Sequence, residues 1–225
     1  TEKDSMKTRI KLKLFNIYFS KNKNFLKKII FSPFKFIIRG TIIKEGEKLL
    51  DIGSGSGQFL YEMKNLGLNV YGIEPGRFDK GGNKKYGVNI KNGNIKSAKL
   101  KKESYDIITL NHVLEHINAP KETLQEIRRV LKKDGVLIIG VPNTNSLAFK
   151  IYNKNWYQLD IPRHVINYSE KNLSFLLYKN GFRVRKVRYN SRPSQFAVSL
   201  MYALNIKGRK VEKLLELIFL PLTWL

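Results

Sequence analysis

A glycine-rich turn directly after a short apolar run constrains this chain more than any other feature. The run Leu49–Ile52 carries one acid, Asp51, and glycines follow at positions 53, 55 and 57. A helix-like segment comes next, with apolar residues from Phe59 to Leu66 on one face. Glycine lets a backbone approach a ligand closely, and the first turn of a helix presents unpaired N–H groups. The sequence therefore predicts a strand, a tight turn and a helix that bind a nucleotide-like small molecule.

The spacing of the glycines indicates which molecule is bound. A dinucleotide fingerprint needs a third glycine at position 58, where this chain has Gln58. The pattern G-x-G-x-G after Asp-Ile resembles motif I of class I S-adenosylmethionine (SAM) methyltransferases. That family binds a cationic sulfonium with an amino-acid tail, which an acid such as Asp51 suits better than it suits a phosphate. A nicotinamide or flavin fold and a purely structural turn remain the alternatives.

A second apolar segment, Asn69–Glu74, also ends in an acid, 17 residues after Gly57. An acid at the end of such a strand can accept both ribose hydroxyls of an adenosine. The alternative is that Glu74 is one more exposed acid at a strand end. Because Glu74 follows the glycine turn, we favour the binding role.

Strand-like and helix-like segments alternate from residue 47 onward, which predicts an α/β fold with a Rossmann-like, doubly wound parallel sheet. Five strands are expected at residues 48–52, 69–74, 88–91, 105–110 and 136–141. Helices are expected at residues 58–66, 77–86, 120–133 and 171–179, and again within 194–225. A further strand is expected at 182–189. The class I methyltransferase fold normally ends in an antiparallel strand, and no convincing candidate for it follows Tyr189.

The three histidines of the chain are His112, His116 and His164. Two follow the expected strand 105–110, at the sheet edge where ligands bind in such folds, and histidine can take up a proton near neutral pH. The runs YDIITLNHVLEH, RRVLKKDGVLIIGVPN and W-x3-D-x-PRH-x3-YS resemble SAM methyltransferases found beside glycan and cell-envelope biosynthesis genes. Ubiquinone-biosynthesis O-methyltransferases are more distant relatives. The resemblance covers roughly residues 46–189.

This resemblance implies roles for individual residues. In the catalytic role we expect His116 and His164, as general base or as orienting groups; the alternative is that all three histidines are structural. The residues expected to bind SAM lie in the glycine turn, at the ends of the following strands and after the fourth strand: Asp51, Gly53, Ser54, Gly55, Gly57, Gln58, Glu74, Asn94, Ile95, Asn111 and His112.

A metal ion is the less favoured interpretation of the same residues. Some relatives carry Glu-x-x-Glu-His and bind a divalent metal through it and a distant His. This chain has His112 in the place of the first acid, which would favour a transition metal over magnesium. We expect no metal, with His112 and Glu115 lining the SAM or acceptor pocket.

The net charge of +24 points to an anionic partner. Residues 1–50 hold thirteen basic and four acidic side chains, and residues 171–211 hold ten basic and no acidic ones. We expect a basic helical cap at residues 1–45, a SAM-binding core at 46–189 with a substrate-side insertion at 143–169, and a basic, apolar helical tail at 190–225. The cap and the tail could each contact an anionic membrane. We expect a cytoplasmic protein, because cysteine and a recognisable signal peptide are absent.

These observations predict a SAM-dependent methyltransferase acting on a small-molecule, sugar or lipid-linked acceptor, most readily at oxygen. An RNA methyltransferase is one alternative, although the chain has no recognisable RNA-binding module. A non-catalytic SAM-fold module that binds a membrane or partner is the other. The intact glycine turn followed by Glu74 argues against it.

Overall fold

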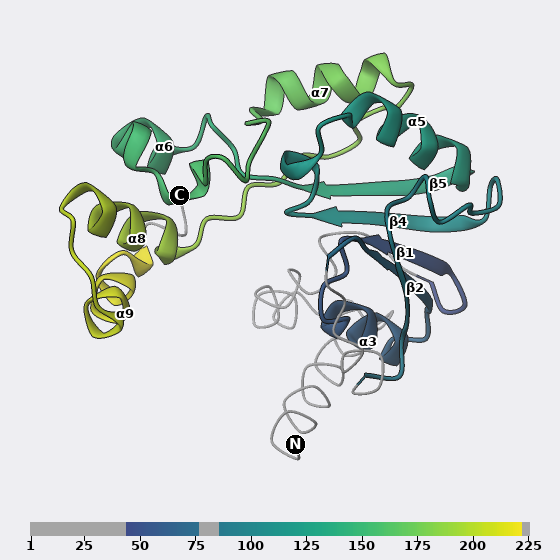
Figure 1. Ribbon diagram of the computed structural model, residues 1–225, viewed down its shortest axis with the longest axis horizontal. Helices are drawn as coiled ribbons and strands as arrows, with labels where there is room; N and C mark the ends of the chain where they lie inside the picture. The colour runs from purple at the N-terminus through teal and green to yellow at the C-terminus, as the bar shows by residue number, and fades with distance from the viewer. Residues whose placement is uncertain (1–43, 77–85, 222–225) are drawn as a thin grey trace, which may run out of the picture. The chain divides into compact units, whose positions relative to one another are not determined.

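The computed structural model describes residues 44–76 and 86–221 (Figure 1). The strands are β1 (Lys48–Ile52), β2 (Asn69–Glu74), β3 (Asn89–Asn92), β4 (Tyr105–Asn111) and β5 (Leu131–Gly140). The α-helices are α3 (Gln58–Asn65), α5 (Pro120–Val130), α6 (Leu147–Tyr152), α7 (Glu170–Lys179), α8 (Pro193–Ala203) and α9 (Arg209–Ile218). Three short 3-10 helices complete the set: η2 (Leu114–His116), η3 (Asn153–Asn155) and η4 (Tyr157–Leu159).

The five strands form one open parallel sheet in the order β3-β2-β1-β4-β5. β1 pairs in parallel with β2 on one side and with β4 on the other, and β2 pairs in parallel with β3. The chain crosses the sheet after β3, so the strand order reverses between β1 and β4. Ligands of doubly wound sheets bind at this switch point, beyond the carboxyl ends of the strands. The predicted fold class is confirmed.

Apolar side chains of β1 and α3 fix the position of the glycine turn between them. Leu49 of β1 packs in one buried cluster with Leu60 and Met63 of α3, and Val88 and Ile90 join it from the β3 segment. Both ends of the turn are therefore anchored in a packed core, where each buried aliphatic side chain contributes about 1.5–3 kcal/mol. The turn between them is held in one conformation.

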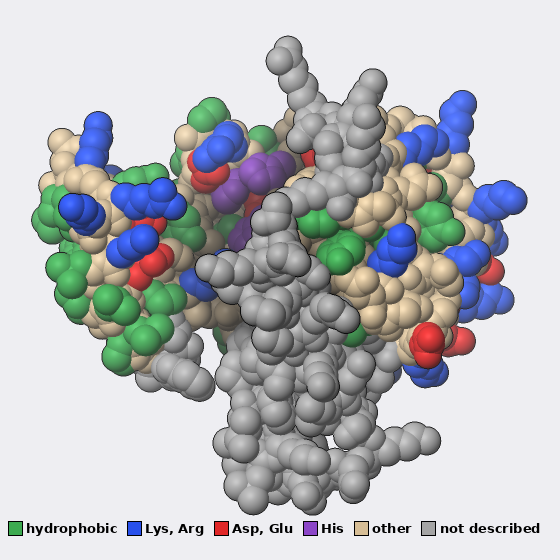
Figure 2. All heavy atoms as spheres, turned by 90° about the horizontal axis from the view of Figure 1, so that it is seen from below, with side chains coloured by type: hydrophobic (Ala, Val, Ile, Leu, Met, Phe, Trp, Pro, Cys, Tyr) green, Lys and Arg blue, Asp and Glu red, His purple; other side chains and the backbone are tan. Residues whose placement is uncertain are grey.

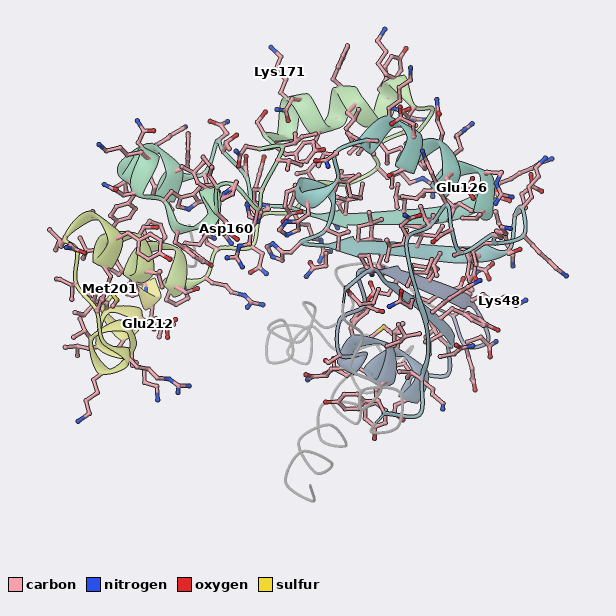
Figure 3. The ribbon with its side chains drawn as sticks, in the orientation of Figure 1. Lys48, Glu126, Asp160, Lys171, Met201 and Glu212 are labelled. Atoms are coloured by element: carbon pink, nitrogen blue, oxygen red, sulfur yellow. The ribbon has the colours of Figure 1, made fainter. Side chains whose placement is uncertain are left out.

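The chain divides into two compact units. One unit ends at Leu110 and takes in Arg129–Ile138, and the other comprises Asn111–Arg128 and the chain from Ile139 onward. The second unit has its own apolar cluster of Ala148, Trp156 and Phe196. Its helices α8 and α9, marked in Figure 3 by Met201 and Glu212, pack against each other. Within the described ranges no helix combines the length and apolarity that a membrane crossing requires.

Three predicted elements need correction. The helix expected to reach residue 133 ends at Val130, because the carbonyls of Arg129 and Val130 accept from the N–H groups of Glu103 and Ser104 instead of continuing the helix. The strand expected at 136–141 therefore begins earlier, since β5 starts at Leu131. The strand expected at 182–189 is wrong, since this segment is neither strand nor helix. Val184 and Val187 are three residues apart, so they would point to opposite faces of a strand, and both are exposed.

Other predictions agree with the structure or fall outside it. Ser169 begins α7 with the expected capping box, in which its Oγ accepts from Asn172 N and its N–H donates to Asn172 Oδ1. No strand follows β5 within the described residues, in keeping with the expected lack of the last antiparallel strand. The basic cap at residues 1–45 lies outside the described residues except for its last two. The helix expected at 77–86 also lies outside them, except for Tyr86.

Candidate functional site

The glycine turn is bound to the end of β2 through its backbone. The N–H groups of Gly53 and Ser54 both donate to the carbonyl of Ile73, at 2.7 and 3.1 Å. The N–H of Gly57 donates to the carbonyl of Ser54 at 3.0 Å, which closes the turn. The glycine turn and the end of the second strand are therefore in direct contact.

Gly55, at the tip of the turn, joins the predicted ribose-binding acid. Its N–H donates to Oε2 of Glu74 at 2.8 Å, and Oε1 of Glu74 accepts from the N–H of Gly76 at 3.1 Å. Gly55 has a φ of +51°, and a Cβ built on it would meet nothing within 4 Å. Open space beside an oriented carboxylate that has lone pairs to spare fits the ribose and methionine parts of SAM.

Gly57 is needed for a different reason. Its φ is +80°, and a Cβ there would lie 2.8 Å from Cδ1 of Ile90 and 2.9 Å from Cγ2 of Val88. The missing side chain of Gly57 thus lets the start of α3 pack on the β3 segment. The open space at Gly55 would allow a ligand to approach the backbone closely, whereas glycine is needed at position 57 for packing.

Asp51 lies inside the sheet. Its side chain is only 3% exposed and accepts a hydrogen bond from the hydroxyl of Thr109, its register partner on β4. The carboxylate therefore joins the two strands at which the sheet order reverses. A direct role of Asp51 in SAM binding stays a prediction.

The other predicted cofactor residues of this unit make local contacts. Oδ1 of Asn94 accepts from Ser97 N at 2.9 Å, the N–H of Asn94 donates to Ser97 Oγ at 2.9 Å, and Ile95 is buried. Nε2 of Gln58 donates to Glu62 at 3.3 Å on the exposed side of α3. The expected adenine contact of Asn94 would use the second lone pair of the same oxygen.

In the second unit, β4 ends in a sharp change of direction at Asn111 and His112. A Cβ on Gly140 would lie 2.6 Å from Oδ1 of Asn111, so the two strand ends are in close contact. His112 has a φ of +54°, uncommon for a side chain of this kind, and its N–H donates to the carbonyl of Gly140 at 2.8 Å. Its Nδ1 lies 3.2 Å from Oε1 of Glu115 of η2, while the imidazole remains exposed.

The two histidines predicted to be catalytic do come together, and their backbone contacts define their tautomers. The ring centroids of His116 and His164 are 4.7 Å apart, and Figure 2 shows histidine side chains close together near the middle of the view. Nδ1 of His116 lies 2.9 Å from the carbonyl of Arg163, and Nδ1 of His164 lies 2.8 Å from the carbonyl of Gln158. A carbonyl oxygen only accepts, so both Nδ1 atoms carry hydrogen. In the neutral rings, both Nε2 atoms therefore have lone pairs.

A buried carboxylate lies beside them. Glu115 is 1% exposed, and its Oε1 is 3.9 Å from Nε2 of His164. Its Oε2 and the hydroxyl of Tyr168 are buried and have no hydrogen-bond partner among the described residues. Burial, and after it the Glu115 charge, raises the pKa of Tyr168 to about 12, so the tyrosine remains a donor at neutral pH. Unpaired buried polar atoms are costly and rare, which makes them strong indications of a binding site.

The segment 153–169 carries the remaining groups of this site. Asp160, labelled in Figure 3, binds Arg163 through Oδ1 at 2.7 Å and places Oδ2 3.8 Å from Nε2 of His164. The N–H groups of Val165 and Ile166 donate to the carbonyl of Glu115, which fastens the segment to η2. We call Glu115, His116, His164 and Tyr168 the acceptor cluster.

A metal ion could use part of this cluster. Ligand atoms of Glu115, His116 and His164 lie within 4.8 Å of one another. Two imidazoles and one carboxylate suit a transition metal better than magnesium. His112 is not in this group, although its Nδ1 lies 3.2 Å from Oε1 of Glu115. The expectation that no metal is needed stays a prediction.

Asp160 and Tyr168 were assigned no role from their sequence pattern. Both are part of the W-x3-D-x-PRH-x3-YS run, so the signal was present as a resemblance. Nothing in the spacing alone indicated that Tyr168 would lie buried near Glu115, 53 residues earlier.

The open parallel sheet, the glycine turn after β1 and the acid at the end of β2 define a Rossmann-like nucleotide-binding enzyme of the class I methyltransferase type. Residues 25–187 match the methyltransferase domain family, and the chain belongs to this family of class I SAM-dependent methyltransferases. SAM is the cofactor of the family.

The chain is also similar to individual curated proteins and solved structures. The chain is 32% identical over 117 residues to the ubiquinone biosynthesis O-methyltransferase of Glaesserella parasuis, covering 47% of this chain and 50% of that protein. It is 30% identical over 135 residues to an uncharacterized protein of Methanocaldococcus jannaschii, covering 53% of this chain and 65% of that one. The crystal structure of YcgJ from Bacillus subtilis has a TM-score of 0.60 at 18% identity over 80% of each chain, which supports the fold. The chain thus spans about half to two thirds of the length of these curated relatives.

Proposed function

We propose that this protein transfers the methyl group of SAM to an oxygen of a small-molecule, sugar or lipid-linked acceptor. The observation that carries the acceptor site is the buried Glu115 carboxylate, whose Oε2 has no hydrogen-bond partner among the described residues. The glycine turn and Glu74 support the SAM site. The family membership supports the type of reaction.

The acceptor cluster suits a hydroxyl group better than a carbonyl or an ether. Oε2 of Glu115 and the Nε2 atoms of the neutral His116 and His164 are hydrogen-bond acceptors, and Tyr168 is the donor among them. A ligand that satisfies three acceptors and one donor must itself donate several hydrogen bonds, as hydroxyl groups do. Sugars and other polyhydroxylated compounds meet this requirement.

In the proposed reaction, bound SAM supplies a methyl group on a sulfonium leaving group. The acceptor oxygen forms a bond to the methyl carbon while the carbon–sulfur bond breaks and its electrons remain on sulfur. The acceptor proton passes to Nε2 of His116 or His164. Alignment of the reacting groups can lower the barrier by about 7–11 kcal/mol, and a general base contributes roughly 10²–10⁴-fold.

The test measures methyl transfer from labelled SAM to a panel of sugar, lipid-linked glycan and small phenol acceptors, with a chelator present. His116→Gln and His164→Gln should each lower turnover at least tenfold with SAM affinity unchanged, and Glu115→Gln should raise KM for the acceptor. Lys154→Gln, an exposed change on η3, is the control. Full turnover by the His116→Gln, His164→Gln double variant would exclude both histidines from the chemistry. Methylation of RNA alone would favour the RNA methyltransferase.

We further propose a cytoplasmic place of action at the inner face of a membrane, where an acceptor for cell-envelope synthesis would be lipid-linked. The basic, acid-free stretch at residues 171–211 supports this proposal. The same stretch would suit RNA on charge alone. Fractionation of cells at low and high salt tests the location.

A further inference from the structure

The outer side of the second unit carries an apolar surface that the reaction does not use. It is formed by α9 and the loop before it, and we call it the α9 surface. Leu214 and Leu217 are 60% and 69% exposed, more than is usual for leucine in a folded protein. The other members are also exposed: Leu204, Ile206, Ile218 and Leu220.

The two acids of α9 lie away from its exposed apolar residues. Successive residues of an α-helix are rotated by about 100°, so Leu214, Leu217 and Ile218 share one edge. The acids Glu212 and Glu216 fall on the opposite side, where they are partly buried. Lys213 is exposed beside the apolar edge, and Lys210 is exposed on the edge itself, one turn before Leu214. The exposed side of α9 is therefore apolar, with one lysine on it and one beside it.

The chain before α9 adds positive charge. Lys207 precedes the helix, and residues 171–208 contain no acid. In Figure 2, hydrophobic, basic and some acidic side chains lie next to each other over this part of the unit, at the left of the view. Basic side chains outnumber acidic ones four to two over residues 204–218, which favours an anionic partner.

We propose that the α9 surface docks on an anionic lipid membrane, with α9 parallel to the membrane plane. The leucine edge enters the boundary between headgroups and acyl chains, while Lys210 and Lys213 contact lipid phosphates. An apolar helix edge with lysines on it and beside it has the composition of interfacial helices. Nucleic acid would satisfy the lysines and leave the leucines in water, so RNA fits less well. This proposal rests on the membrane location proposed above and names the surface that makes the contact. Membrane binding can be measured without catalysis.

The experiment is sedimentation of the full chain with vesicles of phosphatidylcholine, with and without phosphatidylglycerol, at low and high salt. Wild type should bind the vesicles that contain phosphatidylglycerol, bind neutral ones weakly, and lose binding as salt rises. The double change Leu214→Glu, Leu217→Glu should weaken binding at least tenfold. Lys210→Gln with Lys213→Gln should weaken it about fivefold per lysine. Ile151→Glu, on an exposed apolar residue of α6 outside the acid-free stretch, is the matched control and should bind as wild type does.

Circular dichroism and SAM affinity confirm that each variant is folded. The proposal is overturned if neutral vesicles bind equally well, or if Leu214→Glu, Leu217→Glu binds like wild type. It is also overturned if light scattering shows that this variant converts a dimer to a monomer while vesicle binding is unchanged, because a second copy would then cover the surface. Binding of an RNA oligonucleotide without binding of anionic vesicles would assign the lysines to nucleic acid. Loss of methyl transfer with intact vesicle binding would contradict only the proposed reaction.

Discussion

The backbone N–H of Gly55 donates to Oε2 of Glu74 across 2.8 Å and so joins the tip of the glycine turn to the end of β2. The same carboxylate accepts from Gly76 through its other oxygen. Glu74 is therefore already oriented before any ligand arrives, and orientation in advance reduces the free-energy cost of binding.

Replacing Glu74 by Gln should weaken SAM binding about tenfold or more. The amide keeps the size of the side chain but loses the charge and one acceptor oxygen, and a hydrogen bond to a charged group contributes about 1.5–3 kcal/mol. Isothermal titration calorimetry with SAM measures the change. Glu103→Gln, an exposed acid of the same unit, should bind as wild type does. An affinity of Glu74→Gln within twofold of wild type would show that Glu74 is only a structural acid.

Two glycines of the turn should respond differently to alanine. Gly57→Ala meets Ile90 and Val88 and keeps an unfavourable φ, so we expect a loss of about 1–3 kcal/mol in the free energy of unfolding. Gly55→Ala has room for its methyl group and should lose less stability. Relative to its loss of stability, Gly55→Ala should lose more SAM affinity than Gly57→Ala does, because its methyl group occupies the open space beside Glu74. Urea unfolding measures the stability and calorimetry the SAM affinity. The same ratio of affinity loss to stability loss in both variants would contradict this division of roles.

Tyr168→Phe should lower turnover about tenfold while leaving the protein as stable as wild type or slightly more so. The hydroxyl is buried without a partner among the described residues, so its removal relieves a desolvation cost of up to about 1–3 kcal/mol. The pKa of Tyr168 is raised to about 12 from 10.0, so the folded state holds this proton more tightly than the unfolded state. The resulting stability is complete below about pH 10 and is lost as the pH rises toward 12.

Turnover and thermal unfolding of Tyr168→Phe are compared with those of Tyr189→Phe, whose hydroxyl is bonded to Glu170 at the surface. The control should keep full activity. A large loss of stability in Tyr168→Phe would mean that the hydroxyl has a partner in the folded protein, and the binding role would then fail.

Much of the fold could be predicted because local patterns and packing agree over residues 47–141. β1 and β2 begin and end where apolar runs indicate, since β1 is buried from Leu49 and β2 at Gly72 and Ile73 in a parallel sheet. The end of α5 could not be predicted, because Leu131 continues the apolar stripe of the helix. The backbone hydrogen bonds at that end, from Glu103 to Arg129 and from Ser104 to Val130, join residues 26 positions apart.

The arrangement of the acceptor cluster could not be predicted for the same reason, since it depends on contacts between residues far apart in the sequence. The spacing within residues 112–116 places His112 beside Glu115 within one turn of chain. The approach of His164 and Tyr168 depends on backbone bonds from Val165 and Ile166 to the carbonyl of Glu115. The periodicity of apolar residues does not predict such long-range hydrogen bonds. The only sequence signal that placed these residues in the site was the resemblance carried by the W-x3-D-x-PRH-x3-YS run.

Asp106→Asn should destabilise the sheet by about 1 kcal/mol at neutral pH, and the loss should vanish in acid. Asp106 accepts from Lys132 of β5 and from the N–H of Lys48 of β1, at 2.6 and 2.9 Å, so it joins three strands. Burial alone would raise the pKa of Asp106, but the hydrogen bonds and charges of Lys132 and Lys48 outweigh it and lower the pKa. A lowered pKa gives stability that is present above the unfolded value of about 4 and is lost as the pH falls through the folded value. Urea unfolding at neutral pH and near pH 3 measures this, with Asp134→Asn, an exposed acid on β5, as the control. A difference between Asp106→Asn and wild type that is equally large at both pH values would mean that the carboxylate acts through packing and not through its charge.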